Sequence, residues 1–200
     1  MTTPNTPKRL RICLIGPGNT SIPPAGWGAV ESLIWDYYCN LKKYHEVTII
    51  NEADPSQIIS QSNRERYDVV HIMYDDHIIT APYLTCKKIF YTSHFAYITH
   101  PDFQTQYAHY FNNIFLPVIQ LQNYITINAL SPAIKAVYTQ FGFPEDKINV
   151  LNNGACENQF RFTEDPSYPD KTIYVAKIEN RKKQHIYQSI PNIDFEGNYQ

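Results

Sequence analysis

The sequence has 200 residues, of which 43% are hydrophobic and 18% charged, and its formal net charge is −2. This composition is typical of a folded globular chain and excludes a mainly disordered one. Because a nucleic-acid-binding surface needs an excess of basic residues, the charge argues against nucleic acid as the main partner. The length fits one domain, or one domain and the beginning of another.

The four cysteines are scattered along the chain and form no C-x-x-C pair, so we expect reduced, mostly buried thiols and no bound metal. The N-terminal stretch MTTPNTPKRL has no apolar signal core. The longest apolar run, residues 111–127, is interrupted by asparagines, glutamines and a proline, which makes it too polar to span a bilayer. The sequence therefore predicts a cytoplasmic protein without a transmembrane segment.

The first element along the chain is a buried parallel strand, predicted for the apolar run RLRICLIG at residues 9–16. A loop with two prolines and two glycines, SIPPAGWG, follows it. Such a loop can simply end a strand, or it can expose backbone N–H groups that hold an anion. Apolar residues then recur at helical spacing from Val30 to Leu41, which predicts a helix.

Further short apolar runs predict strands at residues 45–50, 67–73, 87–94, 123–130 and 147–154. Ser131 and Pro132 have the residue types of an N-cap and a first helical position, and they predict a helix that ends at Gly142. Strands that alternate with helices are typical of an α/β fold. We therefore expect a Rossmann-like parallel sheet with helices on both faces.

A change of composition marks the end of this first domain. Residues 160–171 are charged, rich in proline and without apolar periodicity, and a new strand is predicted from residue 172. We therefore predict a domain over residues 1–162, a linker over 163–171, and the start of a second domain, left incomplete, over 172–200.

Five motifs in this order resemble the family 4 glycosyltransferases. They are GWGAVE, YHEVTII, YDVVHIM, the segment NALSPAIKAVYTQFGFPEDKINVLNNGACENQF, and IYVAKIENRKKQ. The resemblance implies a GT-B fold of two Rossmann-like domains. It also implies transfer of a sugar, with retention of configuration, from a nucleotide-diphosphate sugar to a glycan or another hydroxyl acceptor.

The sequence departs from the family in length, because family members are roughly twice as long. The family's paired-glutamate motif, which holds the donor, lies beyond Gln200. The chain is thus either a fragment or a shortened relative, and whether it is itself an enzyme stays open. The alternative function is a non-catalytic glycan- or acceptor-binding protein. The second domain could also join copies of the chain into a homo-oligomer.

The resemblance assigns Gly26 and Gly28 to the loop that approaches the donor diphosphate, where glycines allow close backbone approach. Ala29 replaces the usual adjacent glycine, which puts that approach in doubt. A plain turn between strand and helix is the alternative. Trp27 either covers a sugar or is a packed aromatic residue of the loop.

His94 is aligned by the resemblance with a histidine that faces the transferred sugar. There an imidazole can bond a sugar hydroxyl and help to stabilise positive charge in the transition state. His71 could line the same cleft or be a structural residue at a strand end. Tyr74 and the three residues after it, Asp75, Asp76 and His77, could contact an acceptor, although a solvated turn over residues 74–77 explains the sequence as well.

Lys177 and Lys182 stand where the family carries an arginine and a lysine on the donor diphosphate. Two cations there would neutralise charge on the leaving group, so that no metal and no cofactor is expected. A lysine at position 177 lacks the bidentate fork of arginine. A solvated basic helix start is the alternative.

A third class, a Rossmann oxidoreductase, is suggested by the loop GPGN at residues 16–19. The dinucleotide fingerprint needs a third glycine where this chain has Ser21. We therefore expect no nicotinamide cofactor.

Overall fold

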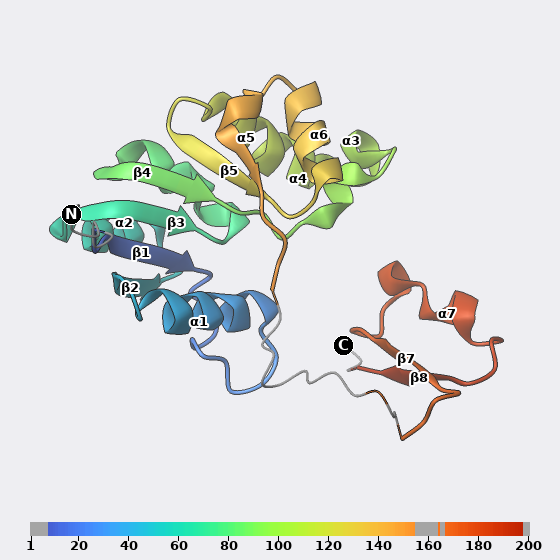
Figure 1. Ribbon diagram of the computed structural model, residues 1–200. Coiled ribbons are helices and arrows are strands. Elements are labelled where there is room, and N and C mark those ends of the chain that lie inside the picture. The colour runs from blue at the N-terminus through green and yellow to red at the C-terminus, as the bar shows by residue number, and fades with distance from the viewer. Residues whose placement is uncertain (1–7, 155–163, 165–166, 198–200) are drawn as a thin grey trace, which may run out of the picture. The chain divides into compact units, whose positions relative to one another are not determined.

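The computed structural model describes residues 8–154, 164 and 167–197. The chain divides into two compact units, residues 1–154 and 155–200, and each is treated separately below (Figure 1). The predicted domain boundary at residue 162 and part of the predicted linker fall outside the described residues.

The first unit contains a six-stranded parallel sheet with the order β2-β1-β3-β4-β5-β6. Its strands are β1 (Arg11–Gly16), β2 (Glu46–Asn51), β3 (Tyr67–Ile72), β4 (Cys86–Tyr91), β5 (Ile125–Ala129) and β6 (Ile148–Val150). All six lie within or beside the predicted apolar runs. Most of them end earlier than predicted. For example, β4 ends at Tyr91 rather than at residue 94.

Helices connect the strands. They are α1 (Ala29–Leu41), α2 (Pro55–Arg64), α3 (Phe103–Gln106), α4 (Ala108–Tyr110), α5 (Leu116–Gln120) and α6 (Pro132–Gln140). Short 3-10 or π-helical turns lie between them: η1 (Asp75–Tyr83), η2 (Ala96–Thr99), η3 (Phe111–Phe115) and η4 (Glu145–Lys147). The predicted N-cap of α6 is confirmed, because the Ser131 hydroxyl accepts a 3.2 Å hydrogen bond from the Ile134 amide.

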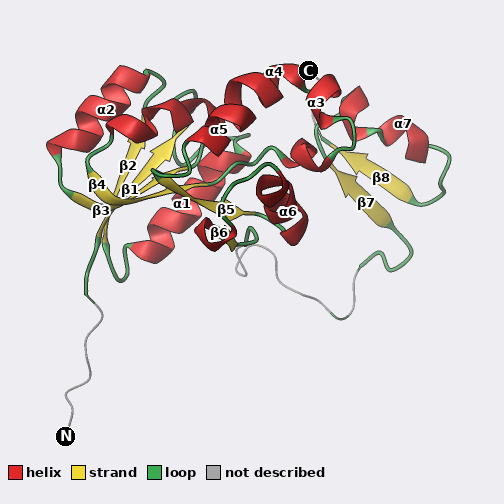
Figure 2. Ribbon diagram, turned by 90° about the horizontal axis from the view of Figure 1, so that it is seen from above, coloured by secondary structure: helices red, strands yellow, loops and turns green. Residues whose placement is uncertain are grey.

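Helices pack on both faces of the sheet, as predicted. Alternate residues of β1 point to opposite faces: Leu14 joins a cluster with Ile34 of α1, and Ile15 joins a larger cluster with Ile58 of α2. The larger cluster also holds the buried residues of α5 and α6. In Figure 2, α1 lies on one side of the strands and α2 on the other. This arrangement confirms a Rossmann-like sheet with helices on both faces.

The cysteines of the described part are free thiols. Cys13 is fully buried within β1, and burial raises the pKa of its thiol to about 12. Cys39 and Cys86 are partly buried. Cys156 lies outside the described residues.

The second unit contains a two-stranded parallel sheet of β7 (Thr172–Val175) and β8 (Ile193–Glu196). The short helices η5 (Asn180–Lys182) and α7 (Gln184–Tyr187) connect its strands. Two apolar side chains of β7 face solvent, since Ile173 is 59% and Val175 is 68% exposed.

None of the helices in the described ranges is both long and apolar enough to cross a membrane.

Candidate functional site at the carboxyl edge of the sheet

The strand order places a topological switch point in the first unit. The chain passes from β1 to β2 on one side, and then returns to place β3 on the other side of β1. In open α/β sheets, ligands bind beyond the carboxyl ends of the strands at such a point. The segments that leave β1, β3 and β4 there are residues 16–19, 73–77 and 92–95.

The loop after β1 packs tightly against the end of β2. Gly18 has a φ of +81°, and a Cβ atom there would lie 2.1 Å from the backbone nitrogen of Ala53. The Gly18 amide donates a 2.8 Å hydrogen bond to Asn51 Oδ1. The turn itself therefore requires a glycine at this position. Because the Gly18 amide already donates to the Asn51 side chain, it is not free to bind an anion.

The predicted donor loop leads into α1. Glu31 folds back over the helix start, so that a Cβ on Gly28 would lie 2.9 Å from its Oε2. Its other oxygen, Oε1, accepts a 2.6 Å hydrogen bond from the Thr20 hydroxyl. The buried carboxylate thus faces the positive end of the helix dipole.

Two other residues of this loop are open to solvent. A Cβ on Gly26 would meet no atom within 4 Å, which leaves space beside the backbone there. Trp27 is 64% exposed, so it is not the packed loop aromatic that was one of the two predictions.

His71 is the penultimate residue of β3. Its ring packs edge-on against Tyr37 and Phe90, with ring centroids 5.7 and 6.4 Å away. Its Nε2 is 2.8 Å from the Thr92 hydroxyl oxygen. Burial, and then the nearby His94, lower the pKa of His71 to about 4, so the ring is neutral at pH 7.

The His71 ring also lines a shallow groove of about 250 Å³ on the sheet face that carries α1. The residues around this groove are Ile12, Leu14, Tyr37, Leu41, Val69, His71, Phe90, Asn128 and Leu151. Apolar side chains dominate the lining. The groove runs over the face of the sheet, so it differs from the edge where the switch point lies.

His94 lies three residues beyond the end of β4 and is half-buried. Burial lowers the pKa of its imidazole, which favours the neutral ring at pH 7. Its buried Nε2 has no hydrogen-bond partner among the described residues. A neutral imidazole can donate a hydrogen bond to a ligand hydroxyl or accept one from it. The Nε2 atom itself is covered, so a ligand would reach it only after the ring or its neighbours move.

The segment after β3 is not the solvated turn that was the alternative prediction. It forms η1, and of residues 74–77 only Asp76 is exposed. His77 is buried with its Nε2 3.2 Å from the carbonyl oxygen of Pro17, which joins this segment to the loop after β1. The Tyr74 ring packs against the His77 ring at 5.2 Å.

Asp75 belongs to the segment 74–77 considered for the acceptor side, but the sequence did not predict its hydrogen-bonded position. Its carboxylate accepts hydrogen bonds from the hydroxyls of Tyr91 at 2.6 Å, Ser93 at 3.2 Å and Tyr110 at 3.0 Å. Burial raises the pKa of Asp75, and the three hydroxyls oppose that shift. No sequence motif links these four positions, because the donors come from β4, the loop after it, and α4.

The two predicted lysines lie in the second unit. The Lys177 ammonium is 3.9 Å from the Glu179 carboxylate, and its carbonyl accepts a 2.8 Å bond from Gln184 Nε2. Lys182 ends η5 and is half-buried, and its carbonyl accepts a 2.7 Å bond from the Tyr174 hydroxyl. Their proposed contact with a donor stays a prediction.

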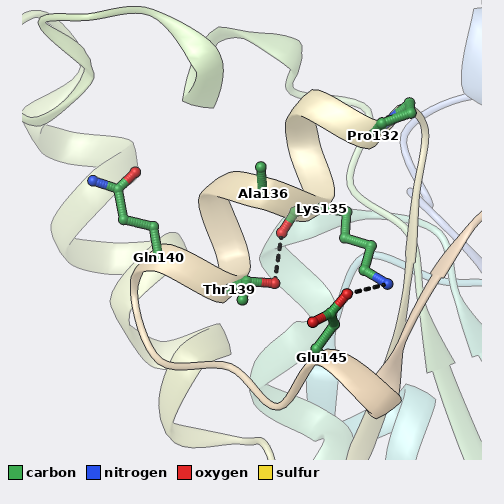
Figure 3. Close-up of a pocket in the computed structure, with 6 residues that line it drawn as sticks. All are labelled: Pro132, Lys135, Ala136, Thr139, Gln140 and Glu145. Atoms are coloured by element: carbon green, nitrogen blue, oxygen red, sulfur yellow. Dashed lines mark hydrogen bonds and ion pairs between the residues drawn. The ribbon is translucent and has the colours of Figure 1, made fainter.

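A second hollow, of about 550 Å³, lies along α6 and contains none of the predicted site residues (Figure 3). The basic residue in its lining, Lys135, forms an ion pair in which its Nζ lies 3.1 Å from Oε1 of Glu145. Within the described ranges, no three or more histidine, cysteine or acidic side chains come together as they would around a metal ion.

Comparison with known proteins gives structural matches only. No protein-family model matches the chain, and neither does any curated protein. Crystal structures of Anabaena Alr3699/HepE match 94% of the chain, and the chain covers 60% of theirs. The structure in complex with UDP-glucose is 14% identical with a TM-score of 0.60, and that with UDP and glucose is 12% identical with a TM-score of 0.63.

AviGT4, a glycosyltransferase involved in avilamycin A biosynthesis, is 14% identical with a TM-score of 0.59. That match covers 94% of this chain and 64% of AviGT4. The chain therefore has the fold of known glycosyltransferase structures, and it spans about 60% of the length of the HepE structures it matches.

Proposed function

We propose that the protein acts as a glycosyltransferase of the family 4 type with a GT-B architecture. It moves a sugar from a nucleotide-diphosphate sugar to a hydroxyl acceptor and retains the configuration at the anomeric carbon. One observation carries the proposal: His94, a neutral and half-buried imidazole, lies at the carboxyl edge of a glycosyltransferase-type sheet. The motif resemblance supports the same activity.

In this proposal His94 bonds a hydroxyl of the transferred sugar and stabilises the positive charge that develops on its ring. The backbone around Gly26 and Gly28 approaches the donor diphosphate. Lys177 and Lys182 neutralise the leaving nucleoside diphosphate, which makes a metal ion unnecessary. Trp27, His71 and Tyr74 are proposed for the acceptor side.

The test is hydrolysis and transfer from a panel of UDP- and GDP-sugars, with the anomeric configuration of the product read by NMR. His94→Ala should reduce turnover at least about tenfold, because a charge-stabilising contact is lost. His109→Ala is the matched control, since His109 is exposed on α4. Absence of turnover with every donor, or equal turnover of the two variants, would contradict the proposal.

The lysines have their own test. Lys182→Ala should weaken binding of the donor nucleotide in calorimetry. Lys171→Ala in the same unit, where the ammonium is exposed and pairs with Asp194 at 2.8 Å, should leave it unchanged. Equal affinities for the two variants would remove Lys182 from the donor site.

A second candidate function is a non-catalytic protein that binds a glycan or acceptor. The exposed Trp27 and the half-exposed rings of Phe95, Tyr97 and Tyr107 favour it, because aromatic faces are common in carbohydrate-binding surfaces. Such a protein should bind glycans and ignore UDP and GDP. Calorimetry with both ligand classes distinguishes the two functions.

A further inference from the structure

The Asp75 carboxylate connects three separate segments of the first unit. Its oxygens accept hydrogen bonds from Tyr91 in β4, from Ser93 in the loop after β4, and from Tyr110 in α4. Asp75 itself begins η1, and two residues separate it from the end of β3. One buried acceptor therefore fixes the relative positions of β3, β4 and α4 at the carboxyl edge of the sheet.

The same cluster fixes both neighbours of His94. Ser93 donates to Asp75, and its hydroxyl oxygen accepts a 3.1 Å hydrogen bond from the Phe95 amide. The Phe95 ring stacks on the Tyr110 ring with centroids 3.9 Å apart. His94 thus lies in a tight turn whose two ends are both held by groups that contact the Asp75 network.

The two oxygens of an ionised carboxylate match the three hydroxyls around them, although burial disfavours the charge and raises the pKa of Asp75. Ionised aspartate only accepts hydrogen bonds, and the hydroxyls of Tyr91, Ser93 and Tyr110 all lie within reach of it. The Ser93 and Tyr110 hydroxyls are also 2.8 Å apart, so one of their two protons is shared between the carboxylate and the neighbouring hydroxyl. An asparagine keeps one acceptor oxygen and replaces the other by an NH₂ donor, so it cannot accept hydrogen bonds on both sides as the carboxylate does. The bonds to a charged acceptor are also the stronger ones, which makes the turn stiffer.

We propose that Asp75 is a positioning residue that acts through His94: it fixes the Ser93–Phe95 turn and thereby holds the imidazole in its half-buried place. This role goes beyond the proposed glycosyl transfer, because it depends only on the contacts within the first unit. It predicts that weakening the network changes the surroundings of His94 while the sheet stays folded.

The test is an NMR titration of the histidine rings in the full chain. Asp75→Asn loosens the turn and hydrates the His94 ring, so the pKa of His94 should rise toward its ordinary value by about half a unit or more. Asp76→Asn is the matched control, because Asp76 is the exposed neighbour in the same helix. The titratable group next to His94 is His71, whose titration is followed in the same spectra.

Two further variants keep the test decisive if Asp75→Asn does not fold. Ser93→Ala removes the link between Asp75 and the Phe95 amide, and Tyr110→Phe removes one donor but keeps the ring stack. Both should raise the pKa of His94 in the same direction, Tyr110→Phe less. The proposal is overturned if the variants fold and have lower melting temperatures while the pKa of His94 stays unchanged. In that case the hydrogen bonds around Asp75 only stabilise the fold. Because no substrate is used, this proposal and the proposed glycosyl transfer fail separately.

Discussion

The hydroxyl of Tyr91, the last residue of β4, donates a 2.6 Å hydrogen bond to the carboxylate of Asp75, which begins the helix after β3. Tyr91 is fully buried, and burial together with the charge of Asp75 raises the pKa of its phenol well above the ordinary value. The phenol therefore stays protonated at neutral pH and remains a hydrogen-bond donor to Asp75.

Removal of this hydroxyl should destabilise the first unit. Tyr91→Phe leaves a buried carboxylate without its shortest hydrogen bond, so the free energy of unfolding in urea should fall by about 1–3 kcal/mol. Tyr124→Phe is the control, because Tyr124 is 53% exposed and should change stability very little. Equal effects of the two substitutions would mean that the bond contributes nothing measurable.

The two glycines of the loops at this edge should respond differently to alanine. Gly18→Ala forces a Cβ to within 2.1 Å of the Ala53 backbone at a φ of +81°, so stability should fall by about 1–3 kcal/mol. Gly26→Ala places its Cβ in open space and should cost less than about 0.5 kcal/mol. Thermal melts of both variants measure the difference. A larger loss for Gly26→Ala would contradict this description of the loops.

Acid should destabilise the protein through His71. The pKa of His71 is about 4 in the folded state and near 6.5 when unfolded, so the unfolded chain binds the proton first as the pH falls. The stability that the neutral ring contributes is therefore complete above pH 6.5 and is lost between pH 6.5 and about 4. The pKa values of His77 and His94 are also lowered, and these residues act in the same direction.

The His71 contribution can be isolated by comparison. Asp75 has a raised pKa and acts in the opposite direction, since its ionisation weakens the folded state as the pH rises. His71→Gln should therefore lose about 1–3 kcal/mol less than wild type between pH 6.5 and 4, measured by urea unfolding at each pH. His109→Gln, exposed on α4, serves as control. Identical pH profiles for wild type and His71→Gln would contradict the assignment.

The sheet could be predicted from the sequence because its strands are short runs of buried apolar residues. Examples of such runs are residues 12–15 and 125–127. The helix α2 was not predicted, since its surface is mostly polar and only Ile58 among its apolar residues is fully buried. The N-cap of α2 is Asp54, whose carboxylate accepts a 2.8 Å hydrogen bond from the Ser56 amide. An aspartate before a proline is the sequence pattern that could have predicted the start of this helix.

The candidate site was predictable only in part. A histidine after an apolar run points to the carboxyl edge of the sheet, which is where His94 lies. Asp75 gave no such signal, because an acidic pair after a strand is typical of a solvated turn. One of its hydrogen-bond donors is Tyr110, 35 residues away, and no local pattern shows which tyrosine will reach it.

The central claim is that the carboxyl edge of the first sheet binds a nucleotide sugar, and chemical-shift mapping of the isotope-labelled chain tests it most directly. Titration with UDP-sugars and GDP-sugars should give saturable shifts, with at least one donor, in residues 16–18, 26–29 and 93–95. His94→Ala should weaken that binding. No saturable shift with any donor, or shifts confined to the opposite ends of the strands near Arg11 and Tyr67, would contradict the claim.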